Sequence, residues 1–443
     1  MKRFSKSKLL VTGALLLSGT ILFAGQQPSP GELGRQQSNT SQAELQPDSA
    51  VPAQAPGEIY KAAMHPLEVV RSSLDNWSDA ELGALTAGMH KAHDACEAMR
   101  PEEFTGDDLF DLARLCGLGQ DWSKENAAAL AYVASRLQKH RAQVYALSVN
   151  ALVHLDALDL ALETTREMLR VLPYDAEVGY AVRYMKDELD QRSSPSALEL
   201  AGEEHPALVA ALAKHVPLKA AEGDAIMSIG ALYESGMELA FWRRYANDTS
   251  AAAATQADID SALAAATAIS AEDTARIARI RSRYGLLGKQ IPTIPLIRSL
   301  ELPSAKPTLS LPEGAFTVLV LFPDWCGSCR RMMKSLTEFA KVNKGTPIRA
   351  FGLVFEDDSV IPEQTGHKQF LNELKGTSTL VVPAMVVQTF SADEFPLGIV
   401  LDGHRNVRFI GVLTANAFNG NGYVEKTIQK MTRASSAGGI TPQ

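Results

Sequence analysis

The sequence has few cysteines and few long apolar runs. Only four of its 443 residues are cysteine, too few for a fold knitted together by disulfides. Beyond Leu9–Phe23, no stretch approaches the roughly 20 apolar residues that a spanning helix needs, which excludes a polytopic membrane protein. With 46% hydrophobic and 21% charged residues, the chain is typical of globular proteins, and its length favours two or three domains.

Acidic residues outnumber basic residues along the middle of the chain. Residues 1–25 hold four cations and no anions, and residues 313–443 hold 13 Lys and Arg against 12 Asp and Glu; within a formal net charge of −8, residues 26–312 therefore carry −13. Such an acidic segment repels nucleic acid and anionic lipid headgroups. We expect no nucleic-acid partner, and membrane contact only through the N-terminal segment.

The N-terminus is typical of an export signal. A basic patch precedes the apolar run Leu9–Phe23, and small residues follow at Ala24 and Gly25. Bulky Leu22 stands where a cleavage site prefers a small residue, so the leader is either cleaved or retained as a membrane anchor. No cysteine follows the run, which excludes a lipidated N-terminal cysteine. We predict an exported protein, periplasmic or otherwise extracytoplasmic.

The segment from about Glu58 to Leu287 predicts a helical array. Apolar residues recur at helical spacing, Ala is abundant and β-branched runs are nearly absent. The segment that starts at Leu109 can be laid on the one that starts at Val144 at an offset of 35, a period typical of helix-turn-helix repeats. Ala161 and Pro173 resemble positions of a tetratricopeptide unit. A generic stack of helical hairpins and a tetratricopeptide-like array both remain open, and either offers a surface for another polypeptide.

Prolines and then buried strands mark the C-terminal part of the chain. Five prolines between positions 292 and 312 end the helical array. From Ala315 we predict strands at TVLVLF, IRAFGLVF, LVVPAMVV, LGIVL and VRFIGVL, with helices at 328–342 and 362–374. The fold class is therefore multidomain, an all-α helical-hairpin array followed by an α/β domain whose central sheet is flanked by helices.

The predicted organisation assigns each part of the chain to one segment. The segments are a signal peptide or anchor at 1–25, a disordered linker at 26–57, a helical repeat-like domain at 58–288, a Pro-rich connector at 289–312, the α/β domain at 313–435 and a flexible tail at 436–443.

The motif Trp325-Cys326-Gly327-Ser328-Cys329 lies where the first buried strand turns into a helix. At a helix N-terminus, unsatisfied N–H groups and the helix dipole stabilise a thiolate on Cys326. The two-residue spacing lets Cys329 resolve a mixed disulfide on Cys326. The pattern predicts Cys326 and Cys329 as the catalytic pair. A zinc half-site is disfavoured, because no second cysteine pair follows at metal spacing; we expect no metal and no cofactor.

This part of the chain resembles the thioredoxin-like superfamily, and more narrowly the exported TlpA-type thiol:disulfide oxidoreductases. The resemblance spans roughly residues 290–433 and rests on TVLVLFPDWCGSC, IRAFGLVFEDD and FPLGIVLDGHRNVRFIGVL. It implies a cis-proline facing the two sulfurs, which Pro396 matches best, with Pro383 as the rival. It also implies client-binding roles for Trp325, Phe395 and Pro396.

Some residues depart from the superfamily's pattern. Val320 and Met332 stand where acidic residues are common, so Glu356, in the loop Glu356-Asp357-Asp358, is either a substitute proton shuttle or a residue of a solvated turn. Gly327-Ser328 replaces the Gly-Pro of strongly reducing members, which leaves the direction of electron flow open. The resemblance favours reduction over oxidation or isomerisation.

Two further cysteines, Cys96 and Cys116, fall in the helical region. An oxidising compartment would permit a structural disulfide between them; two buried free thiols and a redox relay are the alternatives. His90 and His93 share a helical face near Cys96, but no ligand set completes a metal site.

Two functions follow from these patterns. The first is an exported oxidoreductase that acts on protein disulfides, with client proteins bearing disulfides or thiols, an upstream electron-transfer partner, and a helical domain for client or partner binding. The alternative is a helical-repeat scaffold whose thioredoxin-like domain is redox-inactive.

Overall fold

The structure is a computed structural model. It describes residues 55–73, 79–137, 139–192, 194–215, 225–267, 269–299, 307–324, 326–342, 348–355, 374, 376–413, 424 and 428–429. The predicted leader, most of the predicted linker, the tail, the 362–374 helix except Leu374, the loop Glu356-Asp357-Asp358 and Trp325 lie outside these residues. Within them, no helix is long and apolar enough to cross a membrane.

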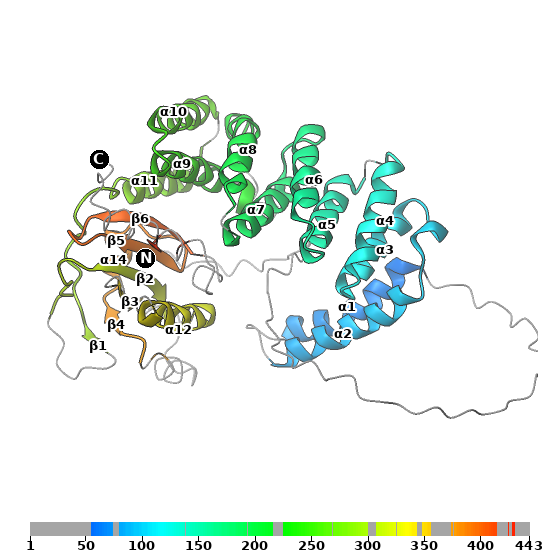
Figure 1. The fold of residues 1–443 in the computed structure, drawn as a ribbon, viewed down its shortest axis with the longest axis horizontal. Helices are drawn as coiled ribbons and strands as arrows, with labels where there is room; N and C mark the ends of the chain where they lie inside the picture. The colour runs from blue at the N-terminus through cyan, green and yellow to red at the C-terminus, as the bar shows by residue number, and fades with distance from the viewer. Residues whose placement is uncertain are drawn as a thin grey trace, which may run out of the picture. The chain divides into compact units, whose positions relative to one another are not determined.

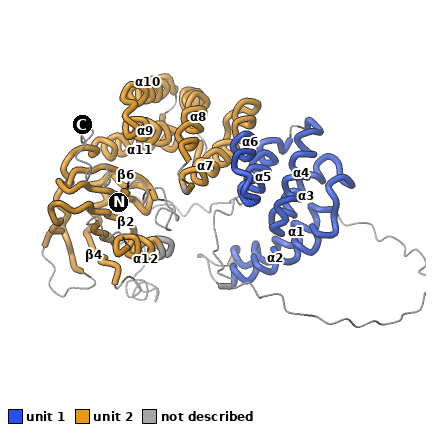
Figure 2. Tube along the Cα trace, viewed as in Figure 1, with its two compact units in different colours: residues 1–164 blue, residues 165–443 orange. Residues whose placement is uncertain are grey.

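The chain forms two compact units, residues 1–164 and 165–443 (Figure 2). The last helices of the helical region therefore belong to the same unit as the sheet. The predicted domain boundaries at 58, 288 and 313 stay predictions.

Unit 1 consists of helices (Figure 1), and those between residues 56 and 147 share one apolar cluster. Apolar residues at helical spacing, such as Leu109, Leu112, Ala113 and Cys116, give one helix a buried face. Asp121 begins the next helix by accepting a hydrogen bond from the Lys124 backbone N–H at 3.1 Å. The helices are α1 (Pro56–Ser73), α2 (Asp79–Glu97), α3 (Asp107–Leu118), α4 (Trp122–Ala134), α5 (Arg141–His154) and α6 (Leu158–Val171), which crosses into unit 2.

Unit 2 begins with more helices and ends with a mixed sheet (Figure 1). Its helices before the sheet are α7 (Ala176–Gln191), α8 (Ser196–Ala213), α9 (Ile229–Tyr245), α10 (Thr249–Ala265) and α11 (Ala271–Tyr284). The sheet contains β1 (Arg298–Ser299), β2 (Phe316–Pro323), β3 (Ile348–Phe355), β4 (Thr379–Val382), β5 (Leu397–Leu401) and β6 (Val407–Val412), with α12 (Gly327–Val342) and α14 (Met385–Thr389) between strands.

The strand order is β1-β4-β3-β2-β5-β6. β2, β3 and β4 are parallel, and β5 and β6 form an antiparallel hairpin that continues the sheet from β2. The strand β2 is apolar on both faces because each face packs on a core. Val318 and Val320 contact the cluster that contains α12, whereas Leu319 and Leu321 contact the one that contains α14. The predicted helical array and flanked sheet are both present.

Two parts of the sheet domain differ from the sequence-based expectations. The predicted strand LVVPAMVV is wrong in its second half: β4 ends at Val382, and Met385–Thr389 is helical. Pro383 has no N–H for the ladder, so the strand stops there. The connector also joins the sheet, because the Ile297 N–H donates to Val381 O at 2.9 Å and Gly288 N–H donates to Val407 O at 2.8 Å.

Candidate active site

Cys326 lies at the carboxyl end of β2, at the first turn of α12. The Asp324 N–H donates to Phe355 O at 3.2 Å, which continues the pairing of β2 with β3, and the Cys326 N–H donates to Pro323 O at 3.1 Å in the turn that follows. The Cys329 N–H then donates to Cys326 Sγ at 3.3 Å. A backbone donor at the start of α12 therefore faces the first sulfur of the motif.

The structure joins Cys326 and Cys329 in a disulfide. Cys326 is 7% exposed and Cys329 is 0% exposed. Both pack in the apolar cluster of α12 and β2. Of the two cysteines, only Cys326 keeps any exposed surface.

Pro396 follows a cis peptide bond, Phe395–Pro396. In the register of β2 with β5, Leu321 pairs with Leu397, so Phe395 and Pro396 come to the edge of the sheet where β2 ends and the cysteine motif begins. The Phe395 ring lies 5.0 Å from the Phe355 ring, centroid to centroid, at the end of β3. Pro383, the rival, follows β4, and its peptide bond is not among the cis bonds of the described residues.

The surroundings of the two sulfurs are apolar at the two positions where the sequence departs from the superfamily's pattern. Val320 and Met332 are both buried in the cluster that holds the cysteines. Asp324 is a buried carboxyl two residues before Cys326, and the sequence pattern alone assigned it no role.

The second cysteine pair, Cys96 and Cys116, is a disulfide between α2 and α3. Both residues are 0% exposed within the apolar cluster of unit 1. The Lys124 ammonium caps the end of α2 by donating to Cys96 O at 2.9 Å and Glu97 O at 2.7 Å. Neither sulfur has access to a client protein in this arrangement.

The histidines and carboxylates do not gather into a metal site in the part of the chain that the structure describes. No group of three or more His, Cys, Asp or Glu side chains there could hold a metal ion. His93 instead forms a hydrogen bond between Nδ1 and Gly119 O at 3.0 Å.

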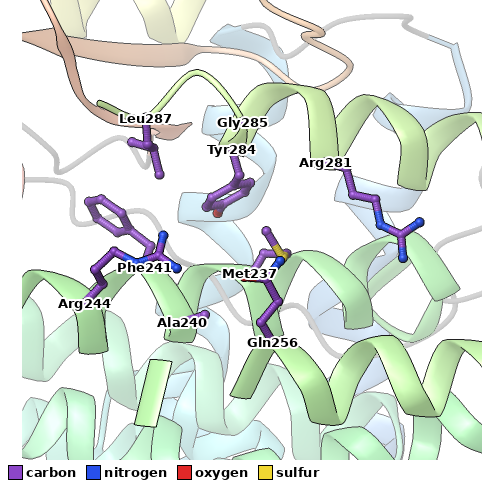
Figure 3. Close-up of a pocket in the computed structure, with 9 residues that line it drawn as sticks. All are labelled: Met237, Ala240, Phe241, Arg244, Gln256, Arg281, Tyr284, Gly285 and Leu287. Atoms are coloured by element: carbon purple, nitrogen blue, oxygen red, sulfur yellow. The ribbon is translucent and has the colours of Figure 1, made fainter. Parts of the chain in front are cut away.

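A pocket of about 360 Å³ lies between α9, α10 and α11 (Figure 3). Tyr284 points into it from α11, and Met237 and Gln256 line the opposite side. Its lining residues include arginines but no cysteine, histidine or carboxylate.

Sequence reasoning missed one group of residues directly before the cis-proline segment. Asp393 and Glu394, directly before Phe395, form ion pairs with arginines of α11. Two features of the sequence could have indicated these ion pairs: the acidic pair in ADEFP and the four arginines of AEDTARIARIRSRY.

No protein-family model matches the sequence, and no curated protein matches it. Solved structures are similar to about a third of it. The thioredoxin domain of a thiol-disulfide oxidoreductase from Bacteroides vulgatus is 15% identical, with a TM-score of 0.26, covering 33% of this chain and 97% of that one. A thiol:disulfide interchange protein from Bacteroides sp. is 16% identical, with a TM-score of 0.27, covering 34% and 93%.

A third such structure is a putative thiol:disulfide interchange protein DsbE from Chlorobium tepidum, 13% identical, with a TM-score of 0.23, covering 33% of this chain and 99% of that one. Within the described residues, the sheet domain combines three parallel strands and an antiparallel hairpin with a cysteine pair at the start of α12 and a cis-proline before β5.

Proposed function

We propose that the protein is an exported thiol:disulfide oxidoreductase that acts on disulfides of client proteins through Cys326 and Cys329. The observation that carries this proposal is the Cys326–Cys329 disulfide at the start of α12, with Cys326 7% exposed, Cys329 0% exposed and the Cys329 N–H aimed at the Cys326 sulfur. In the reduced protein that N–H and the helix N-terminus favour a thiolate on Cys326.

The exchange needs no cofactor. The Cys326 thiolate attacks one sulfur of the client disulfide, and the other client sulfur leaves as a thiolate that takes up a proton. Cys329 loses its proton and attacks Cys326 Sγ, which releases the second client sulfur. Two electrons pass to the client, and the protein is left with the disulfide bond that the structure contains. A dithiol donor returns it to the reduced form.

The client would bind at the edge of the sheet beside Pro396. The backbone of Phe395 would pair with an extended client segment, a mode of recognition that depends little on side chains. Trp325, which lies outside the described residues, is proposed as a further client contact. The helical units would bind or orient clients or an electron-transfer partner.

Turnover of a protein disulfide tests the proposal. With dithiothreitol as donor, the wild-type protein should reduce insulin, and Cys326→Ser should lower the rate by at least about a thousandfold because the nucleophile is gone. The matched control is the double variant Cys96→Ser/Cys116→Ser, which removes the buried pair and should retain turnover. Equal rates for wild type and Cys326→Ser would remove Cys326 as the nucleophile.

A trapping experiment separates this function from the scaffold alternative. Cys329→Ser cannot resolve a mixed disulfide, so clients should accumulate linked through Cys326. Partners that are recovered only noncovalently, with no reductant-sensitive adduct, would support a helical scaffold with a redox-inactive thioredoxin-like domain.

Export is proposed on the N-terminal sequence. A secreted disulfide oxidoreductase from Mycobacterium tuberculosis is among the similar structures, 13% identical, with a TM-score of 0.22, covering 29% of this chain and 92% of that one. Mass spectrometry of the N-terminal peptide, on protein recovered from a bacterial periplasm, distinguishes a cleaved leader from a retained one. A start near Gly25 indicates cleavage, a start at Met1 in the membrane fraction indicates an anchor, and full-length protein in the cytoplasm would contradict export.

A further inference from the structure

The segment 391–395, called here the pre-proline loop, connects α14 to the cis-proline. Ala392 is buried, and the ring of Phe395 packs on Phe355. Ser391 has a positive φ of 50°, a left-handed backbone conformation that is unfavourable for a residue with a side chain. The Ser391 N–H donates to Gln388 O at 3.0 Å and the Ala392 N–H donates to Val387 O at 2.9 Å, so the end of α14 holds this conformation. Beyond it, Asp393 and Glu394 are contacted by the helical part of unit 2.

The central contact is made by Arg283, the largest fully buried side chain of the described residues. The face of α11 that is buried consists of Ile277, Ile280 and Arg283. The Arg283 guanidinium donates to Asp393 Oδ1 at 2.9 Å and also to Glu234 of α9. An arginine that is 0% exposed is stable only when carboxylates satisfy it, and these two come from a helix and from the pre-proline loop.

Two further arginines on the same helix complete the contact. Arg276 pairs with Glu394 and lies 3.7 Å from Asp393, and Arg279 lies 3.7 Å from the same carboxylate. The stem of Arg276 passes over Gly230 of α9, where a Cβ would collide with it. The formal charges of this group are balanced, because three guanidinium groups face the three carboxylates of Asp393, Glu394 and Glu234. Burial raises the pKa of Glu234 to about 7, although Arg283 opposes this shift.

We propose that Arg276, Arg279 and Arg283 are positioning residues for disulfide exchange with clients, because they hold the pre-proline loop that presents Phe395 and Pro396. Their ion pairs fix the loop directly before the residues proposed to bind the client. The inference rests on the proposed function and extends it, since it makes the helical part of unit 2 a component of the client-binding site.

Asp393→Asn tests the proposal, since it keeps the shape of the side chain and removes its charge. Backbone amides of 391–395 should exchange hydrogen for deuterium about tenfold faster, because hydrogen bonds to a charged partner are lost. The KM for insulin should rise about three- to tenfold. The kcat and the reaction of reduced Cys326 with the small disulfide 5,5′-dithiobis(2-nitrobenzoate) should stay within twofold, since a small reagent does not use the loop.

The matched control is Arg281→Ala on the same helix. Arg281 pairs with Asp260 and Tyr233 rather than with the loop, so its loss should leave loop exchange and KM unchanged. A second variant, Glu394→Gln, removes a more exposed charge and should shift both readouts in the same direction by a smaller factor. It keeps the test decisive if Asp393→Asn folds poorly.

The outcomes separate this inference from the proposed function. Unchanged amide exchange in the loop and unchanged KM in both loop variants would overturn the positioning role even if the wild type is fully active. An inactive wild type would overturn the proposed function and with it the client role of the loop. Faster exchange with an unchanged KM would likewise show that the ion pairs serve only the fold.

Discussion

The two disulfides of this chain lie in different units and in different surroundings. The Cys96–Cys116 disulfide joins two helices of unit 1. Its two cysteines are 20 residues apart in the sequence, and both are 0% exposed. Cys326–Cys329 closes a turn at the start of α12, where Cys326 is 7% exposed and its sulfur accepts a backbone hydrogen bond. The same covalent bond is therefore a cross-link in one place and a candidate reaction centre in the other, and position at a helix start makes the difference.

The largest expected effect is selective reduction. Under native conditions with dithiothreitol, Cys326–Cys329 should be reduced at least about a hundredfold faster than Cys96–Cys116, because the buried pair must wait for local unfolding. Timed alkylation followed by peptide mass spectrometry measures both rates in one sample. Equal rates would show that unit 1 opens readily and would remove the contrast between the two pairs.

The second effect concerns stability. The double variant Cys96→Ala/Cys116→Ala should lower the free energy of unfolding of unit 1 by about 3 kcal/mol, the value expected for a cross-link that closes a loop of 20 residues. Denaturant unfolding followed by tyrosine and tryptophan fluorescence measures the change. An unchanged midpoint would mean that helix packing alone holds α2 against α3.

The third effect depends on pH and belongs to unit 2. Burial raises the pKa of Asp187 to about 6 and that of Asp190 to about 7. These carboxyls bind their protons more tightly in the folded protein than in the unfolded chain. Their contribution to the free energy of unfolding is therefore fully present below pH 4 and is lost as pH rises to about 7. Asp190→Asn should therefore raise the free energy of unfolding by about 1 kcal/mol at pH 8 and change it little at pH 4.

Comparing the variant with the wild type at both pH values is essential, because burial also raises the pKa of Glu125 in unit 1 and gives that unit the same sign of pH dependence. Thermal melts at pH 4 and pH 8 are sufficient. A stabilisation of equal size at both values would show that the charge of Asp190 is not the cause.

The smallest effect returns to the buried disulfide. Lys124→Met removes the ammonium that caps α2 at Cys96 and Glu97, at a cost of about 0.5–1 kcal/mol. Reduction of Cys96–Cys116 should become a few fold faster, while that of Cys326–Cys329 should not change. The same alkylation assay measures both, and an equal change at the two pairs would point to a loss of overall stability instead.

The sheet domain could be predicted largely because its strands are buried on both faces. Continuous apolar runs such as Phe316–Pro323 and Leu397–Leu401 identify themselves in the sequence. The cysteine motif could be placed for the same reason, since its position follows from the end of β2. The run Thr379–Thr389 has a similar composition, but Pro383 divides it into a strand and a short helix.

Contacts that depend on backbone pairing or buried charge could not be predicted. β1 contains only Arg298 and Ser299, and it joins the sheet through main-chain hydrogen bonds that leave no side-chain pattern. Arg283 is charged and would be expected at the surface. It is buried because two carboxylates neutralise it, and the sequence could not reveal this because both partners lie far from Arg283 along the chain. Only the folded chain brings these groups together.

The joining of the connector and α11 to the sheet has a consequence for the use of fragments. A polypeptide that started at Glu313 would omit Ile294, which packs in the core beneath β2 and β3, together with β1 and every guanidinium that neutralises Asp393. Recombinant production of the sheet domain alone should therefore start no later than α9, at Ile229. The soluble yield of truncations on either side of that residue would locate the minimal length of this fragment.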